Sequence, residues 1–468
     1  MLDVLFWFSF FYWTVLPSTK TPWFQIESIP VNGKDILLVA VACIFLLWPR
    51  MTKPSSTALP RREHLIAAFL EPWHYHLPFL TVSLIFYGAL SLQDNRMDPR
   101  DAKGMLCTLI LTVSSFLLGY NAIAKRPIAS VRPFLWWLTV GLAAIGLLYT
   151  ATSLSSFQLA GVRSALVNDT TVRVQGPLFG SDDGYFALIP ALAFAIQDLI
   201  QNPTQRLFKL AIIFTIMLTL IGLGSRGAML IIGGFLSLTI LFNKNKKVAL
   251  LAALGVMVVV IVAGAIVFAT SNSGDRLQSF GDTSRSDTYS TSFKIIENRT
   301  ADLNIFGSGY GSYWAWYILD VEDGSDVDGG RTFKIIPTSF GPILYHPHST
   351  FLLLIVELGL VGFLYFVFLW TVYARLLLRD SRKLVFPIFS CGMVASGFSV
   401  FMNFFIFRLH VLSCLWWIYL FGALALSSSA STCNTQNTIP PTNYDSWQDR
   451  LINFKQRARR SQRNLTNE

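Results

Sequence analysis

Two histidines, His346 and His348, immediately precede one of the apolar stretches of this chain, in "YHPHSTFLLLIVELGLVG" at residues 345–362. Ser349 or Thr350 can cap a helix that begins here, because a hydroxyl oxygen accepts a hydrogen bond from the first backbone N–H groups. The partial positive charge of a helix N-terminus disfavours imidazolium, so a neutral His348 able to accept a proton is expected. A general base is one interpretation of His348. A histidine that only caps the helix or bonds a loop is the other.

Two arginines have surroundings that could bind phosphate. Arg226 in "GLGSRGAML" lies between two apolar stretches and among glycines, which allow the backbone to approach a ligand closely. Arg285 opens the segment 284–313, which ends in the glycine-rich "NIFGSGYGSY". A guanidinium donates two parallel hydrogen bonds and therefore suits a phosphate group. Each has a simpler interpretation: Arg226 as an interfacial anchor, and Arg285 as the partner of a nearby aspartate.

Metal ligands are too few in any one stretch to predict a metal site. His346 and His348 form a pair, as do His74 and His76, but neither pair has a third His or Cys beside it in sequence. The sequence therefore predicts no metal and no cofactor. No disulfide framework is expected either, because four of the five cysteines fall in apolar blocks and Cys433 lies in the tail.

The composition is that of a membrane protein. Hydrophobic residues make up 53% of the 468 residues and charged residues 14%, whereas a soluble protein has about 25% charged residues. The apolar residues form blocks long enough to cross a bilayer. The sequence predicts an all-α polytopic membrane protein with about 12 transmembrane helices. The expected spans are 4–17, 35–48, 77–92, 104–122, 133–152, 184–200, 210–224, 228–242, 248–270, 349–374, 384–401 and 411–428.

Charge predicts the orientation of these spans. The net charge of +10 is scattered over short loops, which is typical of membrane orientation rather than of nucleic-acid binding. The larger share of the 37 Lys and Arg residues lies on the side that holds both termini, so both termini are expected in the cytoplasm. The sequence divides into an N-terminal transmembrane bundle (1–152), a catalytic membrane region (153–428) and a basic cytoplasmic tail (429–468). A large periplasmic loop at 271–347, between spans 9 and 10, is expected to hold short helices of its own.

The order of these motifs is more informative than any one of them. A Ser-Arg-Gly turn is followed by a long outer loop with an arginine and "GSGYG", and then by His-Ser-x9-Gly-x-x-Gly. This order resembles the O-antigen ligase and polymerase family of bacterial envelope polysaccharide glycosyltransferases, which are GT-C-like. The resemblance is best over 170–370 and includes "RVQGPLFGSDDGYFALIPALAFA" at 173–195. The chain departs from the family in having Ser-Asp-Asp at 181–183 in place of Pro-Asn, and in lacking a tryptophan after Arg285.

The resemblance implies an activity, its partners and its site residues. It implies a metal-independent, inverting transfer of a glycan from undecaprenyl pyrophosphate to an acceptor sugar hydroxyl, at the periplasmic face of the bacterial inner membrane. Ligases use lipid A–core as the acceptor, and polymerases use the next glycan repeat unit. His348 would be the catalytic base, and Arg226 and Arg285 would bind the pyrophosphate. Arg173 and Tyr310 would be further substrate contacts.

Three alternatives are left open by the sequence. A ligase is preferred, but a polymerase of O-antigen or exopolysaccharide carries close variants of the same motif. A transporter of lipid-linked glycans would place ionisable residues near the middle of the membrane; after Asp3, Glu357 is the only acidic residue found deep in an apolar block. A structural membrane scaffold is the third alternative. The glycan, the acceptor, the oligomeric state and the roles of His346 and Glu357 are not determined.

Overall fold

Most of the 468-residue chain is described by a computed structural model. The described residues are 2–15, 24–26, 29–31, 33–47, 99–154, 165–167, 171–173, 178, 184–243, 245–270, 293, 296–297, 301–307, 335–338, 341–344, 350–379, 387–402 and 410–438.

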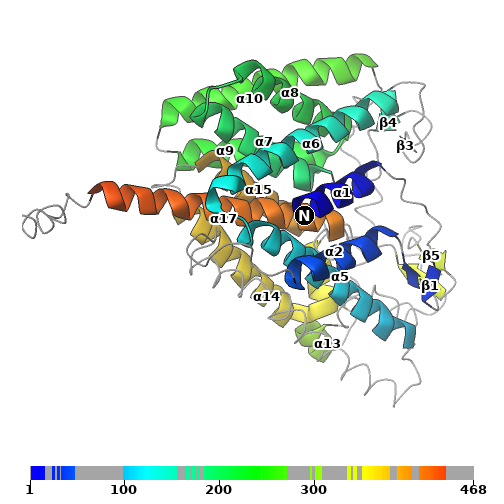
Figure 1. Ribbon diagram of the computed structural model, residues 1–468. Helices are drawn as coiled ribbons and strands as arrows, with labels where there is room; N and C mark the ends of the chain where they lie inside the picture. The colour runs from blue at the N-terminus through cyan, green and yellow to red at the C-terminus, as the bar shows by residue number, and fades with distance from the viewer. Residues whose placement is uncertain are drawn as a thin grey trace, which may run out of the picture.

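The described residues are mainly helical (Figure 1). Each predicted apolar segment among them forms a helix, and the predicted segment 77–92 lies outside them. The predicted start of the helix after His348 is confirmed to within one residue, while the last helix continues past its predicted end at 428. The long helices are α1 (Leu2–Val15), α2 (Gly33–Leu47), α5 (Pro99–Ala124), α6 (Ile128–Leu154), α7 (Tyr185–Gln201), α8 (Arg206–Gly222), α9 (Arg226–Phe242), α10 (Lys246–Thr270), α14 (Thr350–Arg379), α15 (Pro387–Met402) and α17 (His410–Thr438).

The helices differ in length and apolar character. Within the described part of the chain, one helical stretch, 128–152 of α6, is long and apolar enough to cross a membrane by these two criteria. Shorter apolar stretches occur in α5, α7, α9, α10, α14, α15 and α17. The predicted loop helix is present as α13 (Ala301–Phe306), which packs on α14.

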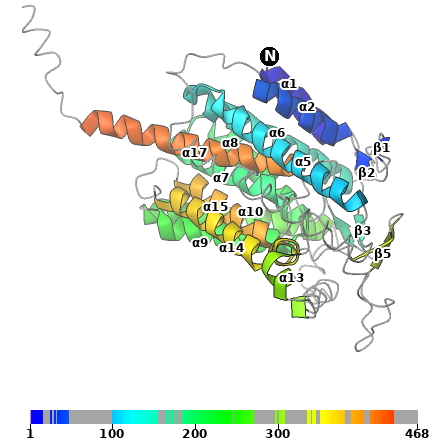
Figure 2. The same cartoon turned by 90° about the horizontal axis from the view of Figure 1, so that it is seen from below.

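Among the described residues, three short antiparallel hairpins accompany the helices, and these were not predicted. Strands of three or four residues are too short to show the alternating pattern by which a strand is predicted. All three hairpins lie at the same end of the bundle in both views (Figures 1 and 2). They pair β1 (Phe24–Ile26) with β2 (Ile29–Val31), β3 (Ala165–Val167) with β4 (Thr171–Arg173), and β5 (Ile335–Thr338) with β6 (Gly341–Leu344).

Helix α7 lies at the centre of the packing. Its residues from Tyr185 to Asp198 are all buried, as expected for a helix that is apolar on every side. It packs against α6, α8, α15 and α17. The approach of α15 is close enough that a Cβ on Gly392 would overlap the Cβ of Ala193. One hydrophobic cluster runs through the bundle, from Phe6 on α1 to Leu426 on α17.

The two ends of α7 define the two ends of the bundle. A helix of 17 residues is about 25 Å long. The end where α7 begins, here called the Tyr185 end, also holds the start of α9. The end where α7 finishes, here called the Asp198 end, holds the start of α15, because the Gln197 side-chain oxygen accepts a hydrogen bond from the Ile388 backbone N–H at 2.9 Å.

Candidate functional site

The turn between α8 and α9 places Arg226 at the first position of a helix. Gly224 takes the left-handed conformation, φ 60°, that ends α8. Ser225 then caps α9, and its hydroxyl oxygen accepts a hydrogen bond from the Ala228 N–H at 3.4 Å. The order Gly-Ser-Arg therefore ends one helix and begins the next within three residues. The predicted bend around Arg226 is thus found in the backbone.

The N-termini of α7 and α9 lie side by side at the Tyr185 end. A Cβ on Gly227 would be 3.6 Å from the Tyr185 hydroxyl, and the Tyr185 side chain is 1% exposed. The N-terminus of a helix is equivalent to roughly half a positive charge. Two such termini next to each other, one of them beginning with Arg226, form a place that favours a bound anion.

The backbone of Arg173 also lies near the Tyr185 end. It is the last residue of β4, paired with Ala165 of β3, and β4 contacts α6. The chain between β4 and α7 is held to α6 by Tyr149, whose hydroxyl accepts a hydrogen bond from the Leu178 N–H at 3.2 Å. The same hydroxyl donates to the Thr14 carbonyl of α1. Tyr149 therefore joins three segments, a role that was not predicted from its position in an apolar block.

Helix α14 carries the glycines of the His-Ser-x9-Gly-x-x-Gly motif. It begins at Thr350, two residues after His348, and is interrupted at Gly359 by a non-helical φ of 67° and ψ of −172°. Helix α13 packs against this interruption. The motif thus includes a break in the helix, which the apolar pattern alone did not reveal.

The predicted site residues differ in what the structure describes. Arg226 and Arg173 are placed by their backbones at the Tyr185 end. His348, Arg285 and Tyr310 lie outside the described residues. The grouping of these five residues into one site therefore stays a prediction. Among the described residues, no three His, Cys, Asp or Glu side chains are arranged to hold a metal ion.

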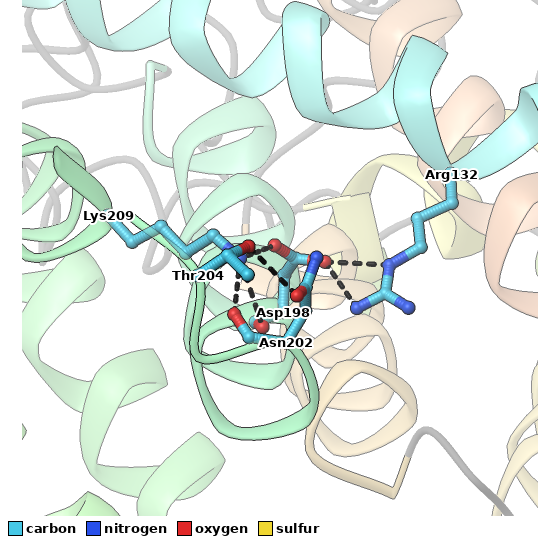
Figure 3. A network of polar contacts seen from close by, with 5 residues as sticks. All are labelled: Arg132, Asp198, Asn202, Thr204 and Lys209. Atoms are coloured by element: carbon cyan, nitrogen blue, oxygen red, sulfur yellow. Dashed lines mark hydrogen bonds and ion pairs between the residues drawn. The ribbon is translucent and has the colours of Figure 1, made fainter. Parts of the chain in front are cut away.

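The opposite end of the bundle contains a charged network that was not predicted (Figure 3). Asp198 of α7 is 5% exposed. Its Oδ1 accepts from Arg132 Nε at 2.7 Å, and its Oδ2 lies 2.5 Å from Lys209 Nζ. Lys209 also donates to the Asn202 carbonyl at 2.6 Å, and Asn202 Oδ1 accepts from the Thr204 hydroxyl at 2.9 Å. Asp198 is thus a buried acidic residue in the last turn of α7, at the end of its apolar block, and it was not singled out from the sequence.

Other basic residues at the Asp198 end neutralise helix C-termini. Lys125 donates to the Phe45 and Leu46 carbonyls at the end of α2, and Arg126 pairs with Asp3. Lys246 donates to the last carbonyls of α9, at 2.6 and 2.8 Å. Cations near a helix C-terminus are stabilising because they oppose its partial negative charge. The two ends are therefore chemically different: the Tyr185 end has paired helix N-termini, and the Asp198 end has basic side chains that are already bound.

Lys34 is a further cation in the helix that begins beyond the β1–β2 hairpin. It is the second residue of α2, and burial lowers its pKa from 10.5 to about 8, an effect partly opposed by the neighbouring Asp35 carboxylate. Its charge therefore depends on pH near neutrality. No site residue was predicted here.

The fold defines the class as a helical, largely apolar bundle, with the N-termini of α7 and α9 side by side at one end. Residues 210–367 match the family model described as O-antigen ligase. This match supports the family predicted from the motifs: the region from α8 into α14 is similar to the O-antigen ligase family, which consists of glycosyltransferase-like enzymes. Comparison with curated proteins and with solved structures found no match.

Proposed function

We propose that this protein is a polytopic membrane glycosyltransferase that moves a glycan from an undecaprenyl-pyrophosphate carrier to an acceptor sugar hydroxyl. The observation that carries the proposal is the position of Arg226. It begins α9 inside the matched region 210–367, beside the N-terminus of α7. A pyrophosphate bound there would meet one guanidinium and two helix N-termini.

The surface of the bundle supports a membrane location. Helix α10 exposes a broad apolar face, which is expected for a helix in contact with lipid. The basic side chains that cap helices at the Asp198 end support a cytoplasmic side there, and a periplasmic side at the Tyr185 end. The exposed apolar residues of α10 include Leu250, Leu251, Leu254, Met257, Val258, Ile261 and Val262.

The proposed reaction is an inverting displacement. His348 takes the proton from the acceptor hydroxyl, and the oxygen attacks the anomeric carbon of the glycan as the bond to the pyrophosphate oxygen breaks. Arg226 and Arg285 bind the pyrophosphate and stabilise the negative charge that it gains on leaving. Arg173 and Tyr310 contact the sugars. Because pyrophosphate is a good leaving group and two guanidinium groups neutralise it, we propose that no divalent ion is required.

The preferred acceptor is lipid A–core, which makes the enzyme an O-antigen ligase. The match to a family model described as O-antigen ligase supports a transferase of this family, and the preference for a ligase rests on the resemblance of the His-Ser-x9-Gly-x-x-Gly motif. The two activities differ only in the acceptor that enters the site, so the assay must offer both.

The test is an in vitro transfer assay with purified protein and undecaprenyl-pyrophosphate glycan, with and without lipid A–core, and with and without chelator. We expect glycan on lipid A–core, undiminished by chelator, and no transfer by His348→Ala. The matched control is His410→Ala, since His410 is another histidine at the start of a long helix, the first residue of α17; it should transfer normally. Longer chains on the carrier alone would indicate a polymerase. Full transfer by His348→Ala would remove His348 as the base, and no product from the unmodified protein would favour a transporter.

A further inference from the structure

Gly359 and the end of α13 form a backbone-to-backbone contact. A Cβ built on Gly359 would lie 2.5 Å from the Gly307 nitrogen, and closer still to the carbonyl carbon and oxygen of Ile305. Real Cβ atoms essentially never approach another atom within 3.0 Å. The last turn of α13 therefore occupies the space that any side chain at residue 359 would need.

Conformation and space both require glycine at residue 359. With φ at 67° and ψ at −172°, Gly359 is in a region that residues with a side chain rarely enter. Gly307, which ends α13, also has a positive φ, 81°. Because the atoms facing residue 359 are backbone atoms, no side-chain rotation could make room for a Cβ. A substitution at residue 359 must therefore move α13 or straighten α14.

Two apolar side chains at the end of α13 are exposed. Ile305 is 42% exposed and Phe306 is 49% exposed. A hydrogen bond from the Asn304 side-chain nitrogen to the Ile296 carbonyl, 3.1 Å, joins α13 to the preceding helical turn. The fit of the α13 end into the break at Gly359 is thus a backbone-to-backbone contact between α13 and α14.

We propose that Gly359 is a positioning residue: the break in α14 is a notch that fixes α13 relative to the helix that follows His348. This inference rests on the proposed function, in which the loop supplies Arg285. The nine residues 350–358 rise about 13.5 Å as a helix. The nine-residue spacing in the motif therefore sets the distance along α14 between Ser349, which follows the proposed base His348, and the break at Gly359.

The first test compares Gly359→Ala with Gly234→Ala in the full-length protein. Gly234 lies within α9, and a Cβ there would have no atom within 4 Å, so it controls for adding a methyl group to a helix of the same region. For Gly359→Ala we expect faster amide hydrogen exchange at 301–307, a kcat for transfer lower by about tenfold or more, which is about 1.4 kcal/mol, and a donor KM within about twofold. A merely structural defect would instead lower the amount of folded protein without separating kcat from KM.

The second test is a double-mutant cycle with Gly307→Ala. Both glycines serve one contact, so the double variant should lose no more kcat than the worse single variant. Three kinetic results would overturn the proposal: normal kcat in Gly359→Ala, an equal loss of kcat in Gly234→Ala, or fully additive losses in the double variant. If the unmodified protein transfers no glycan, the proposed function fails, and unchanged exchange at 301–307 in Gly359→Ala would separately overturn the docking of α13.

Discussion

Replacing Asp198 with asparagine should destabilise the protein more than removing either of its cationic partners. Asp198 and Lys209 have side chains that are 6% and 4% exposed, whereas Arg132 is 34% exposed and can turn to solvent. In Asp198→Asn, Lys209 retains its hydrogen bond to the Asn202 carbonyl at 2.6 Å but has lost its counter-charge. A buried charge without its partner costs about 3–5 kcal/mol.

The matched change, Lys209→Met, should cost less. It leaves the Asp198 carboxylate paired with Arg132, whose Nε remains at 2.7 Å, and removes one charged hydrogen-bonded contact worth about 1.5–3 kcal/mol. The double variant Asp198→Asn with Lys209→Met no longer contains a stranded cation. We therefore expect it to be more stable than Asp198→Asn alone, which is the opposite of what adding two destabilising changes would produce.

The expected change can be measured as a shift in the unfolding midpoint. An unfolding entropy of about 2.1 cal/mol/K per residue over 468 residues is about 1 kcal/mol/K, so Asp198→Asn should lower the midpoint by about 3–5 °C. Tryptophan fluorescence of the purified protein during heating reports the midpoint. Lys247→Met is the control, because Lys247 is an exposed lysine near the same end, and its midpoint should stay within about 1 °C.

Two outcomes would refute the reasoning about this network. A midpoint for Asp198→Asn equal to that of the Lys247→Met control would show that Lys209 is not stranded by the change. A double variant less stable than Asp198→Asn would show that packing of the Lys209 side chain matters more than its charge. Glycan transfer per folded molecule should be unchanged in all these variants, since the network lies about 25 Å from the Tyr185 end.

Two further predictions concern Arg226 and Lys34. Arg226→Lys should lower the rate of glycan transfer by about tenfold or more, because lysine keeps the charge but cannot donate two parallel hydrogen bonds as a guanidinium does. The control is Arg206→Lys, which changes an exposed arginine at the other end of the bundle and should transfer normally. Equal rates in the two variants would count against a contact between Arg226 and the pyrophosphate. For Lys34, burial lowers the pKa to about 8 from 10.5, so between these pH values the unfolded chain binds more protons and the folded protein gains stability as pH rises. The unfolding midpoint should therefore rise with pH relative to that of Lys34→Met, and a constant difference from pH 7 to 10 would contradict the burial of this lysine.

The helices could be predicted because they are encoded in continuous apolar runs. A run such as "YFALIPALAFAI" of α7 needs only its own residues to form a buried helix, and its bounds in the structure agree with the predicted span 184–200 to within a residue. The start of α14 was predicted equally well, because Ser and Thr before an apolar run are a local capping signal. The turn at Gly224 and Ser225 was visible for the same reason.

The Asp198 network could not be predicted because its partners are distant in the sequence. Arg132 is 66 residues from Asp198, and each residue alone is typical of the end of an apolar block. Their meeting depends on α6, α7 and α8 packing against one another. The contact of Tyr149 with the Leu178 N–H has the same origin.

The amino-acid sequence by itself determined where the helices form, which residue types stand at their ends, and which family the region around Arg226 resembles, because these depend on neighbours within a few residues. Tertiary structure alone decided that α7 and α9 begin side by side, that Asp198 pairs with both Arg132 and Lys209, and that the end of α13 packs against Gly359. Each of these is a contact between segments whose distance apart is set by how side chains pack between helices. No local pattern specifies that distance.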